Sequence, residues 1–180
     1  MTFNVLNRKI HYWLGAAIAL PLGVIIATGL LLQIKKQWSW VQPPEQKRAV
    51  EAPALALPAV LEIVRAVPHL GVTGWHDVDR VDVRPGKGIA KVILTSGWEA
   101  QLHLGTGEVL QTAYRRSDLI EAIHDGSFFG GDATKLGLFL PVALALFTLW
   151  LGGLWMWWVP FAAKRRRARI PAATAATGAR

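Results

Sequence analysis

Two long stretches of the chain contain only uncharged, mostly apolar residues. They cover residues 12–34 and 136–163, which are 23 and 28 residues long. At about 1.5 Å of rise per residue, the shorter run forms a helix of about 34 Å, long enough to cross the ~30 Å hydrocarbon core of a bilayer. The pattern therefore predicts two transmembrane helices, at residues 12–34 and 136–160, with the second helix ending near Pro160.

Between these spans the pattern changes to short periodic segments separated by turn residues. Residues 59–67 carry Val60, Val64 and Val67 at helical spacing before a proline, which predicts one helix. Four short runs have the pattern of strands: residues 81–84, 89–95, 99–104 and 109–114. We therefore predict an α+β fold, in which a module of residues 58–116 combines one helix with an antiparallel meander of three or four strands. One face of this sheet would pack on the helix.

Less regular segments connect these parts. Residues 35–57 are proline-rich and aperiodic, which predicts a linker over the membrane surface. Residues 117–135 begin with the spacing of a helix start and reach Gly126, which predicts an interfacial helix and a loop. Residues 1–11 would form a short cytoplasmic N-terminus, and residues 161–180 a basic, disordered cytoplasmic tail.

The net charge of +8 is concentrated at the two ends. All 12 acidic residues lie between Lys35 and Lys135 with 12 of the 20 basic ones, so that stretch is neutral. The other basic residues flank the spans: Arg8, Lys9, Lys164, Arg165, Arg166, Arg167, Arg169 and Arg180. Positive flanks stay on the cytoplasmic side. This predicts both termini inside, with residues 35–135 in the periplasm of a bacterium whose inner membrane the chain crosses twice, and it does not favour nucleic acid as a partner.

The composition adds lipid contact and removes thiol chemistry. The chain has no cysteine, which excludes disulfides, thiolate metal sites and a cysteine nucleophile. Its nine Trp and 52% apolar residues indicate membrane lipid as a partner. Aromatic side chains near the span ends would anchor the chain at the headgroup level: Trp13, Phe128, Phe129, Trp155, Trp157 and Trp158.

Three segments, in this order, resemble the PepSY-associated transmembrane proteins. Residues 8–15 read Arg-Lys-Ile-His-Tyr-Trp-Leu-Gly and precede Thr28-Gly29, which is similar to the first helix of that family. Residues 106–110, Thr-Gly-Glu-Val-Leu, resemble the turn that joins the final two strands of a PepSY module. Residues 123–130, Ile-His-Asp-Gly-Ser-Phe-Phe-Gly, resemble the segment that enters the next membrane helix. The resemblance covers most of residues 8–160.

The resemblance implies two kinds of function. PepSY modules bind or inhibit peptidases, or serve as periplasmic interaction domains. Longer relatives with more membrane helices include ferric-siderophore reductases, which hold b-type haem through histidines. In this chain His11 and His124 match the family motifs. With only two spans and no histidine well inside either, the chain departs from those reductases, which does not favour a complete transmembrane electron path.

The two histidines each have a simpler interpretation. The rise of the first span separates them by about 34 Å, so they cannot ligate one haem within a monomer. A homodimer or another protein would have to supply the second ligand. Otherwise His11 is an amphipathic interfacial side chain, and His124 a helix-end residue that meets the C-terminal dipole. We expect His103 to face solvent and His76 to lie in a solvated loop without a metal.

No set of residues has the pattern of a catalytic site. His124 and Asp125 are adjacent in sequence, whereas a triad requires side chains that converge in space. Our first hypothesis is therefore a non-enzymatic inner-membrane protein whose periplasmic module binds a protein or peptide partner through its sheet edge or helix. The alternative is a haem-b-binding subunit of an iron-uptake or ferric-siderophore reductase system that uses His11 or His124.

Overall fold

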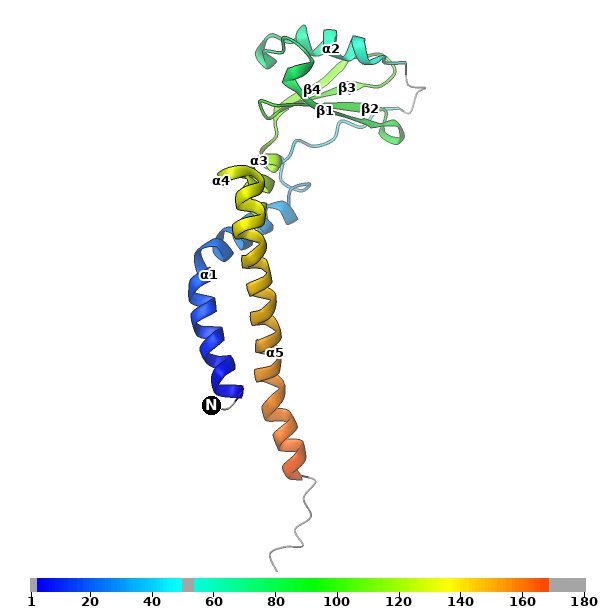
Figure 1. The fold of residues 1–180 in the computed structure, drawn as a ribbon. Coiled ribbons are helices and arrows are strands. Elements are labelled where there is room, and N and C mark those ends of the chain that lie inside the picture. The colour runs from blue at the N-terminus through cyan, green and yellow to red at the C-terminus, as the bar shows by residue number, and fades with distance from the viewer. Residues whose placement is uncertain (1–2, 50–53, 169–180) are drawn as a thin grey trace, which may run out of the picture. The chain divides into compact units, whose positions relative to one another are not determined.

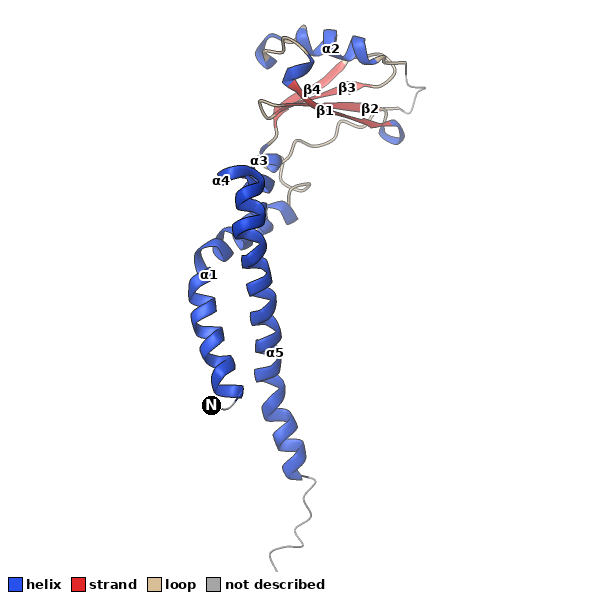
Figure 2. Ribbon diagram, viewed as in Figure 1, coloured by secondary structure: helices blue, strands red, loops and turns tan. Residues whose placement is uncertain are grey.

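The computed structural model describes residues 3–49 and 54–168, and the chain divides into two compact units. One unit comprises residues 1–24 and 129–180, and the other residues 25–128. The first is helical, whereas the second contains the sheet (Figures 1 and 2).

The two apolar runs form long helices. Helix α1 extends over Phe3–Gln33. The second run lies in a π-helical turn at Lys135–Phe139 and in α5 (Leu140–Ala168), and α4 (Ser127–Thr134) precedes it. In each of the two long helical segments, only 11% of the most apolar 18 residues are buried, whereas the core helix of a soluble protein would be mostly buried. The helices therefore expose their apolar side chains, as membrane-spanning helices do toward lipid.

Two boundaries of these helices differ from the expected ones. Helix α1 already begins at Phe3, and α5 continues through Pro160 to Ala168. The expectation that the helix ends near Pro160 was wrong. Residues 162–168 are all Ala, Lys or Arg, which are among the strongest helix formers and sustain the helix beyond the hydrogen bond that the proline removes.

Side chains near the chain's beginning contact α5 within the helical unit. The Asn7 side-chain amide donates a hydrogen bond to the Gly152 carbonyl at 3.0 Å. The Trp155 indole N–H donates to the Asn4 side-chain oxygen at 3.3 Å, and its ring meets the Phe3 ring edge to face at 5.4 Å. Glycine at position 152 permits this contact, because a Cβ there would lie 2.7 Å from the Asn7 oxygen.

The second unit contains a four-stranded antiparallel meander, as predicted. Its strands are β1 (Val78–Arg84), β2 (Ile89–Leu94), β3 (Trp98–His103) and β4 (Val109–Tyr114), paired in the order β1-β2-β3-β4. Single-turn 3₁₀ segments lie at Pro68–Leu70, Trp75–Asp77 and Pro85–Lys87. Between β3 and β4, Gly107 adopts φ +77°, a left-handed conformation that favours glycine.

One face of the sheet packs on helix α2 (Leu57–Arg65), which confirms the expected layer order (Figure 1). Val60 and Val64 of α2 are buried against Val92, Ala100 and Leu102 of the central strands. The helical spacing of the valines and the alternation of the strands direct these side chains into one core.

The other face of the sheet is covered by residues 41–48, a segment that we call the strap. Its Gln46 amide N–H donates to the Gln101 side-chain oxygen at 2.8 Å, and the Gln101 amide donates to the Pro44 carbonyl at 3.0 Å. The Arg48 N–H donates to the Lys87 carbonyl at 3.0 Å. Part of the predicted linker is therefore a layer of the module.

Helix α3 (Arg116–Asp125) follows β4 and ends at Gly126, which adopts φ +84°, as expected from the sequence. The Ser117 N–H donates to the Val41 carbonyl at 2.8 Å, and both residues are fully buried. This bond joins the first residue of the strap to the beginning of α3.

Candidate functional site

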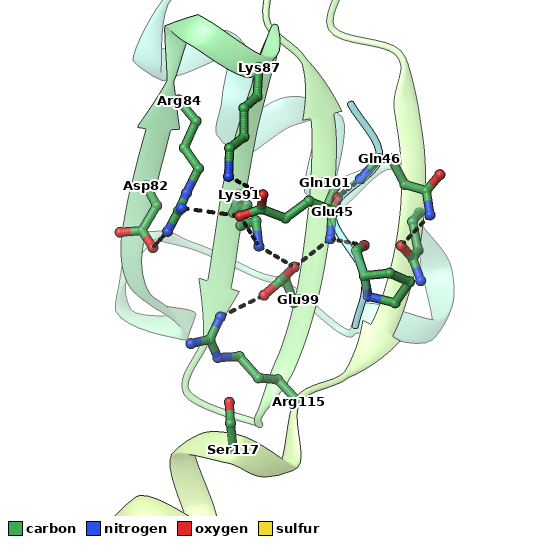
Figure 3. Close-up of polar contacts among 12 residues, drawn as sticks. Glu45, Gln46, Asp82, Arg84, Lys87, Lys91, Glu99, Gln101, Arg115 and Ser117 are labelled. Atoms are coloured by element: carbon green, nitrogen blue, oxygen red, sulfur yellow. Dashed lines mark hydrogen bonds and ion pairs between the residues drawn. The ribbon is translucent and has the colours of Figure 1, made fainter. Parts of the chain in front are cut away.

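Charged side chains meet beneath the strap, on a sheet face where charge is usually left to solvent. Lys91 of β2 and Glu99 of β3 are at most 1% exposed. The strap contributes Glu45, so that two carboxylates flank the Lys91 ammonium (Figure 3). The Lys91 Nζ lies 3.3 Å from Glu45 Oε1 and 3.6 Å from Glu99 Oε1.

Further cations surround the two carboxylates. Glu99 accepts hydrogen bonds from Arg115 Nη1 at 2.8 Å and from the Gln101 amide at 2.7 Å. Glu45 is paired with Arg84 at 3.1 Å and also with Lys87. Both carboxylates therefore have more than one cationic partner, as buried charges require.

Ion pairs in this network, and those of the neighbouring Asp118 with Arg115 and Arg80, shift the pKa of three groups. Burial would raise the pKa of Glu45, but hydrogen bonds and charges from Lys87 and Lys91 outweigh it and lower the pKa. Burial would also raise the pKa of Asp118, but hydrogen bonds and charges from Arg115 and Arg80 outweigh it and lower the pKa below its ordinary value. Burial would lower the pKa of Arg115, yet hydrogen bonds to Asp118 and Glu99 raise it. Carboxyl groups whose pKa is lowered, as for Glu45 and Asp118, are poorly suited to general acid–base catalysis near neutral pH.

His124 contacts the backbone of α1, within the unit that contains the sheet. Its Nδ1 lies 3.0 Å from Thr28 Oγ1 and 3.1 Å from the Ile25 carbonyl oxygen. The carbonyl can only accept, so Nδ1 carries the proton and Nε2 has the lone pair in the neutral ring. A Cβ on Gly29 would lie 3.3 Å from His124 Cε1, so this glycine gives the ring room. The structure thus joins two segments that the sequence motifs singled out separately.

His11 lies in the helical unit, on the side of α1 that meets α5. A Cβ on Gly153 would lie 3.8 Å from His11 Cε1. Its Nδ1 is buried and has no hydrogen-bond partner among the described residues. Along α1, 14 residues or about 21 Å separate His11 from Ile25, whose carbonyl contacts His124.

The remaining histidines stabilise turns of the module. The expectation that His103 faces solvent was wrong, since it is only 7% exposed. Alternation places it on the second sheet face, where its Nδ1 accepts a hydrogen bond from the Thr106 N–H at 3.0 Å. His76 is exposed and contacts Thr73, and His69 contacts Thr112 at 2.9 Å. Within the described ranges, no three His, Asp or Glu side chains are grouped as a metal site requires.

The predicted membrane anchors and topology residues lie on the long helices and at the beginning of α4. Six aromatic side chains are exposed: Trp13, Phe128, Phe129, Trp155, Trp157 and Trp158. Arg8, Lys9, Lys164 and Arg165 are exposed as well, and Arg166 and Arg167 continue the same helix. Exposure of this kind is what lipid contact and headgroup pairing require, and these roles stay predictions.

Sequence reasoning missed the charge network and the partners of His124. Glu45 precedes Lys91 by 46 residues, and Thr28 precedes His124 by 96, so no local pattern connects them. The one available signal for Lys91 and Glu99 was their position on adjacent strands, in line with other polar residues on the face away from α2.

Comparison with known proteins supports the resemblance. The sequence profile of the PepSY-associated TM region matches residues 8–175. A search of curated proteins finds no match to the chain. The match covers nearly the whole chain, including both apolar helices and the sheet between them, and the chain therefore belongs to the PepSY-associated transmembrane family.

Proposed function

We propose that this membrane-anchored PepSY protein is a non-enzymatic interaction module that binds a protein or peptide partner in the periplasm by strand addition at β4. The observation that carries the proposal is the difference between the two edges of the sheet. Strands β1 and β4 are the edges, and each has an outer row of backbone groups unpaired within the sheet. Such a row is a template for another strand.

The two edges differ in charge. Strand β1 contains Asp79, Arg80, Asp82 and Arg84, and charges on an edge strand discourage pairing with another chain. Strand β4 reads Val-Leu-Gln-Thr-Ala-Tyr and has no charge. By charge, β1 is therefore the edge protected against pairing, and β4 is the edge that lacks this protection.

The register identifies which groups of β4 would meet that partner. The Arg115 N–H donates to the Gly97 carbonyl at 2.8 Å, and Glu99 pairs with Ala113 two residues farther along. Hydrogen-bonded and non-bonded pairs alternate in an antiparallel ladder, so Ala113 points its N–H toward β3. The Thr112 N–H then lies on the outer edge, available to an added strand.

A substitution at this position tests the proposal. Proline in place of Thr112 removes the outward N–H without removing a ladder bond, which edge strands tolerate. Thr112→Val keeps the N–H and is the matched control, since both variants lose the hydroxyl contact to His69. In pull-downs from native membranes, we expect a partner to be retained by the wild type and Thr112→Val and lost with Thr112→Pro.

Circular dichroism of the purified variants shows whether the module stays folded. If a folded Thr112→Pro protein retains every partner that the wild type retains, strand addition at β4 is wrong.

The proposed orientation has both termini in the cytoplasm and residues 35–135 in the periplasm of a bacterial inner membrane. It is supported by the basic residues that flank the two spans, Arg8 and Lys9 before the first and residues 164–167 after the second. A reporter that is active only in the periplasm should be inactive when fused after Arg180 and active when inserted in the turn at Gly86. Activity after Arg180 would overturn this orientation.

A second candidate function, haem-b binding, is favoured by the geometry of His124. Ligating histidines usually donate their other ring N–H to a carbonyl or carboxylate, as Nδ1 does here toward Ile25, which leaves the Nε2 lone pair for an iron. A bound haem would supply one-electron redox chemistry, and a second copy of the chain would supply the other histidine that holds it. His11 lacks a carbonyl partner of this kind among the described contacts, although it stays a candidate ligand.

An optical spectrum separates the two functions. Protein purified after haem-replete expression should show a reduced-minus-oxidised b-type band that is lost in His124→Ala and kept in the exposed control His76→Ala. A colourless, folded wild-type protein would exclude the haem function and leave the interaction module.

A further inference from the structure

A hollow lies at the edge of the charge network, between the strap and the turn that joins β1 to β2. Its volume is about 240 Å³, and it lies entirely within the unit of residues 25–128. The residues that line it are Lys36, Gln42, Pro43, Pro44, Glu45, Lys47, Arg84 and Lys87. A volume of this size can hold a phosphate group together with several waters.

The charge of this hollow is strongly positive. Four of its lining side chains are cations, and Glu45 is the single carboxylate. Glu45 is already shared among Arg84, Lys87 and Lys91. Lys36 and Lys47 are exposed and form no ion pair among the described residues. An anion that enters would therefore meet two cations without a counter-charge.

Two residues that line the hollow each contain a buried polar atom without a partner. Arg84 Nε and Gln42 Oε1 have no hydrogen-bond partner among the described residues. Buried polar atoms in folded proteins are normally paired, so both atoms have hydrogen-bonding capacity left for a water or a ligand. Arg84 Nε is a donor, and rotation of the Gln42 amide by 180° would present a second donor to an anion.

One residue that lines the hollow, Lys36, is close in sequence to the end of the first span. The uncharged run of the first span ends at Ile34, only two residues before Lys36. Trp38 and Trp40 follow, are 45% and 47% exposed, and have ring centroids 5.2 Å apart. Arg116 lies over the Trp40 ring at 4.9 Å. Exposed Trp beside a span is typical of the headgroup region, so we expect Lys36 to lie near that level.

We propose that this hollow is a binding site for the phosphate of an anionic phospholipid headgroup, with Lys36 and Lys47 as the principal cations and Arg84 Nε as a directional donor. The site is independent of strand addition at β4 and of haem binding. It would hold the strap and the sheet close to an anionic lipid surface.

The test uses the full chain in detergent, titrated with phosphatidylglycerol and followed by native mass spectrometry. The variant Lys36→Gln/Lys47→Gln removes the two cations that have no ion pair. Each cation near an anionic surface changes lipid affinity by a factor of about five, so we expect the affinity to fall about 30-fold. The matched control is Arg48→Gln/Arg65→Gln, which removes two charges from the same unit outside the hollow and should change the affinity less than twofold.

Three arms decide the outcome. Phosphatidylcholine should bind weakly to the wild type, since its headgroup is neutral overall. Inorganic phosphate at the same concentration should fail to displace phosphatidylglycerol, and Lys36→Arg/Lys47→Arg should restore binding. Equal affinity of the double glutamine variant and the wild type would overturn the proposal. Displacement of the lipid by inorganic phosphate would also overturn it, by showing that the site takes free phosphate.

Discussion

Replacing Glu99 by leucine tests whether the buried charge network stabilises the module. The Glu99 carboxylate is about 1% exposed and contacts Arg115 at 2.8 Å, the Gln101 amide at 2.7 Å and Lys91 at 3.6 Å. Its loss leaves the fully buried Lys91 ammonium with Glu45 as its sole described counter-charge. Removing one partner of a buried ion pair costs about 3–5 kcal/mol, and we expect the free energy of unfolding to fall by that amount.

The double variant Lys91→Met/Glu99→Leu separates charge from packing. Lys91→Met alone should cost about 1–2 kcal/mol, because Glu99 and Glu45 each keep another cation. Removing both charges leaves no buried ammonium, and apolar replacement of a buried pair is often neutral. The loss in the double variant should therefore be about 1–3 kcal/mol smaller than the sum of the single losses.

Amide hydrogen exchange of the full chain in micelles measures these effects on residues 89–103. At 1.4 kcal/mol per factor of ten, Glu99→Leu should accelerate the exchange of β2 and β3 by roughly 100- to 4,000-fold. Glu62→Leu on the exposed side of α2 is the control and should change it little. Strictly additive losses, or acceleration below tenfold in Glu99→Leu, would refute the view that the network is a coupled stabilising unit.

Two further predictions concern the turn at Gly107 and the response to acid. Gly107→Ala should lower the free energy of unfolding by about 1–3 kcal/mol, because φ is +77° and a Cβ would lie 2.8 Å from the Ile63 side chain. Thermal unfolding measures this change. Gly86→Ala is the control and should be nearly neutral, because the space around Gly86 is open. The lowered pKa of Asp118 stabilises the module above the ordinary value of 3.8, and this stability is lost as pH falls through the folded-state pKa. The unfolding temperature should accordingly fall more steeply below pH 4 in the wild type than in Asp118→Asn, and parallel pH profiles would contradict this account.

The strands and spans were predictable because their signals are local. The alternation of apolar and polar residues between 81 and 114 predicts the strands, and the two uncharged runs predict the spans. Neither pattern depends on distant residues. Helix α2 was found in the same way, from valines at helical spacing. The ends of the spans were less predictable, because helix-forming residues continue past Pro160.

The strap was not predictable, and most errors about the site follow from this. Its prolines and polar residues have no period, and they pair with sheet residues 39 or more positions away. Without a covering layer, alternation alone directs Lys91, Gln101 and His103 to solvent. Once the strap is placed, the same alternation buries them. The direction of each side chain was readable from the sequence, whereas its environment was not.

The hydrogen bond between Ser117 and Val41 has a consequence for how the module could be exchanged between proteins. Its N···O distance of 2.8 Å brings together the first residue of the strap and the residue that follows β4 by three positions. A segment whose ends are adjacent can replace a surface loop in an unrelated host without stretching that host. The chain therefore enters and leaves the strap-covered sheet at adjacent points, which is the geometry that insertion into a surface loop of another protein requires.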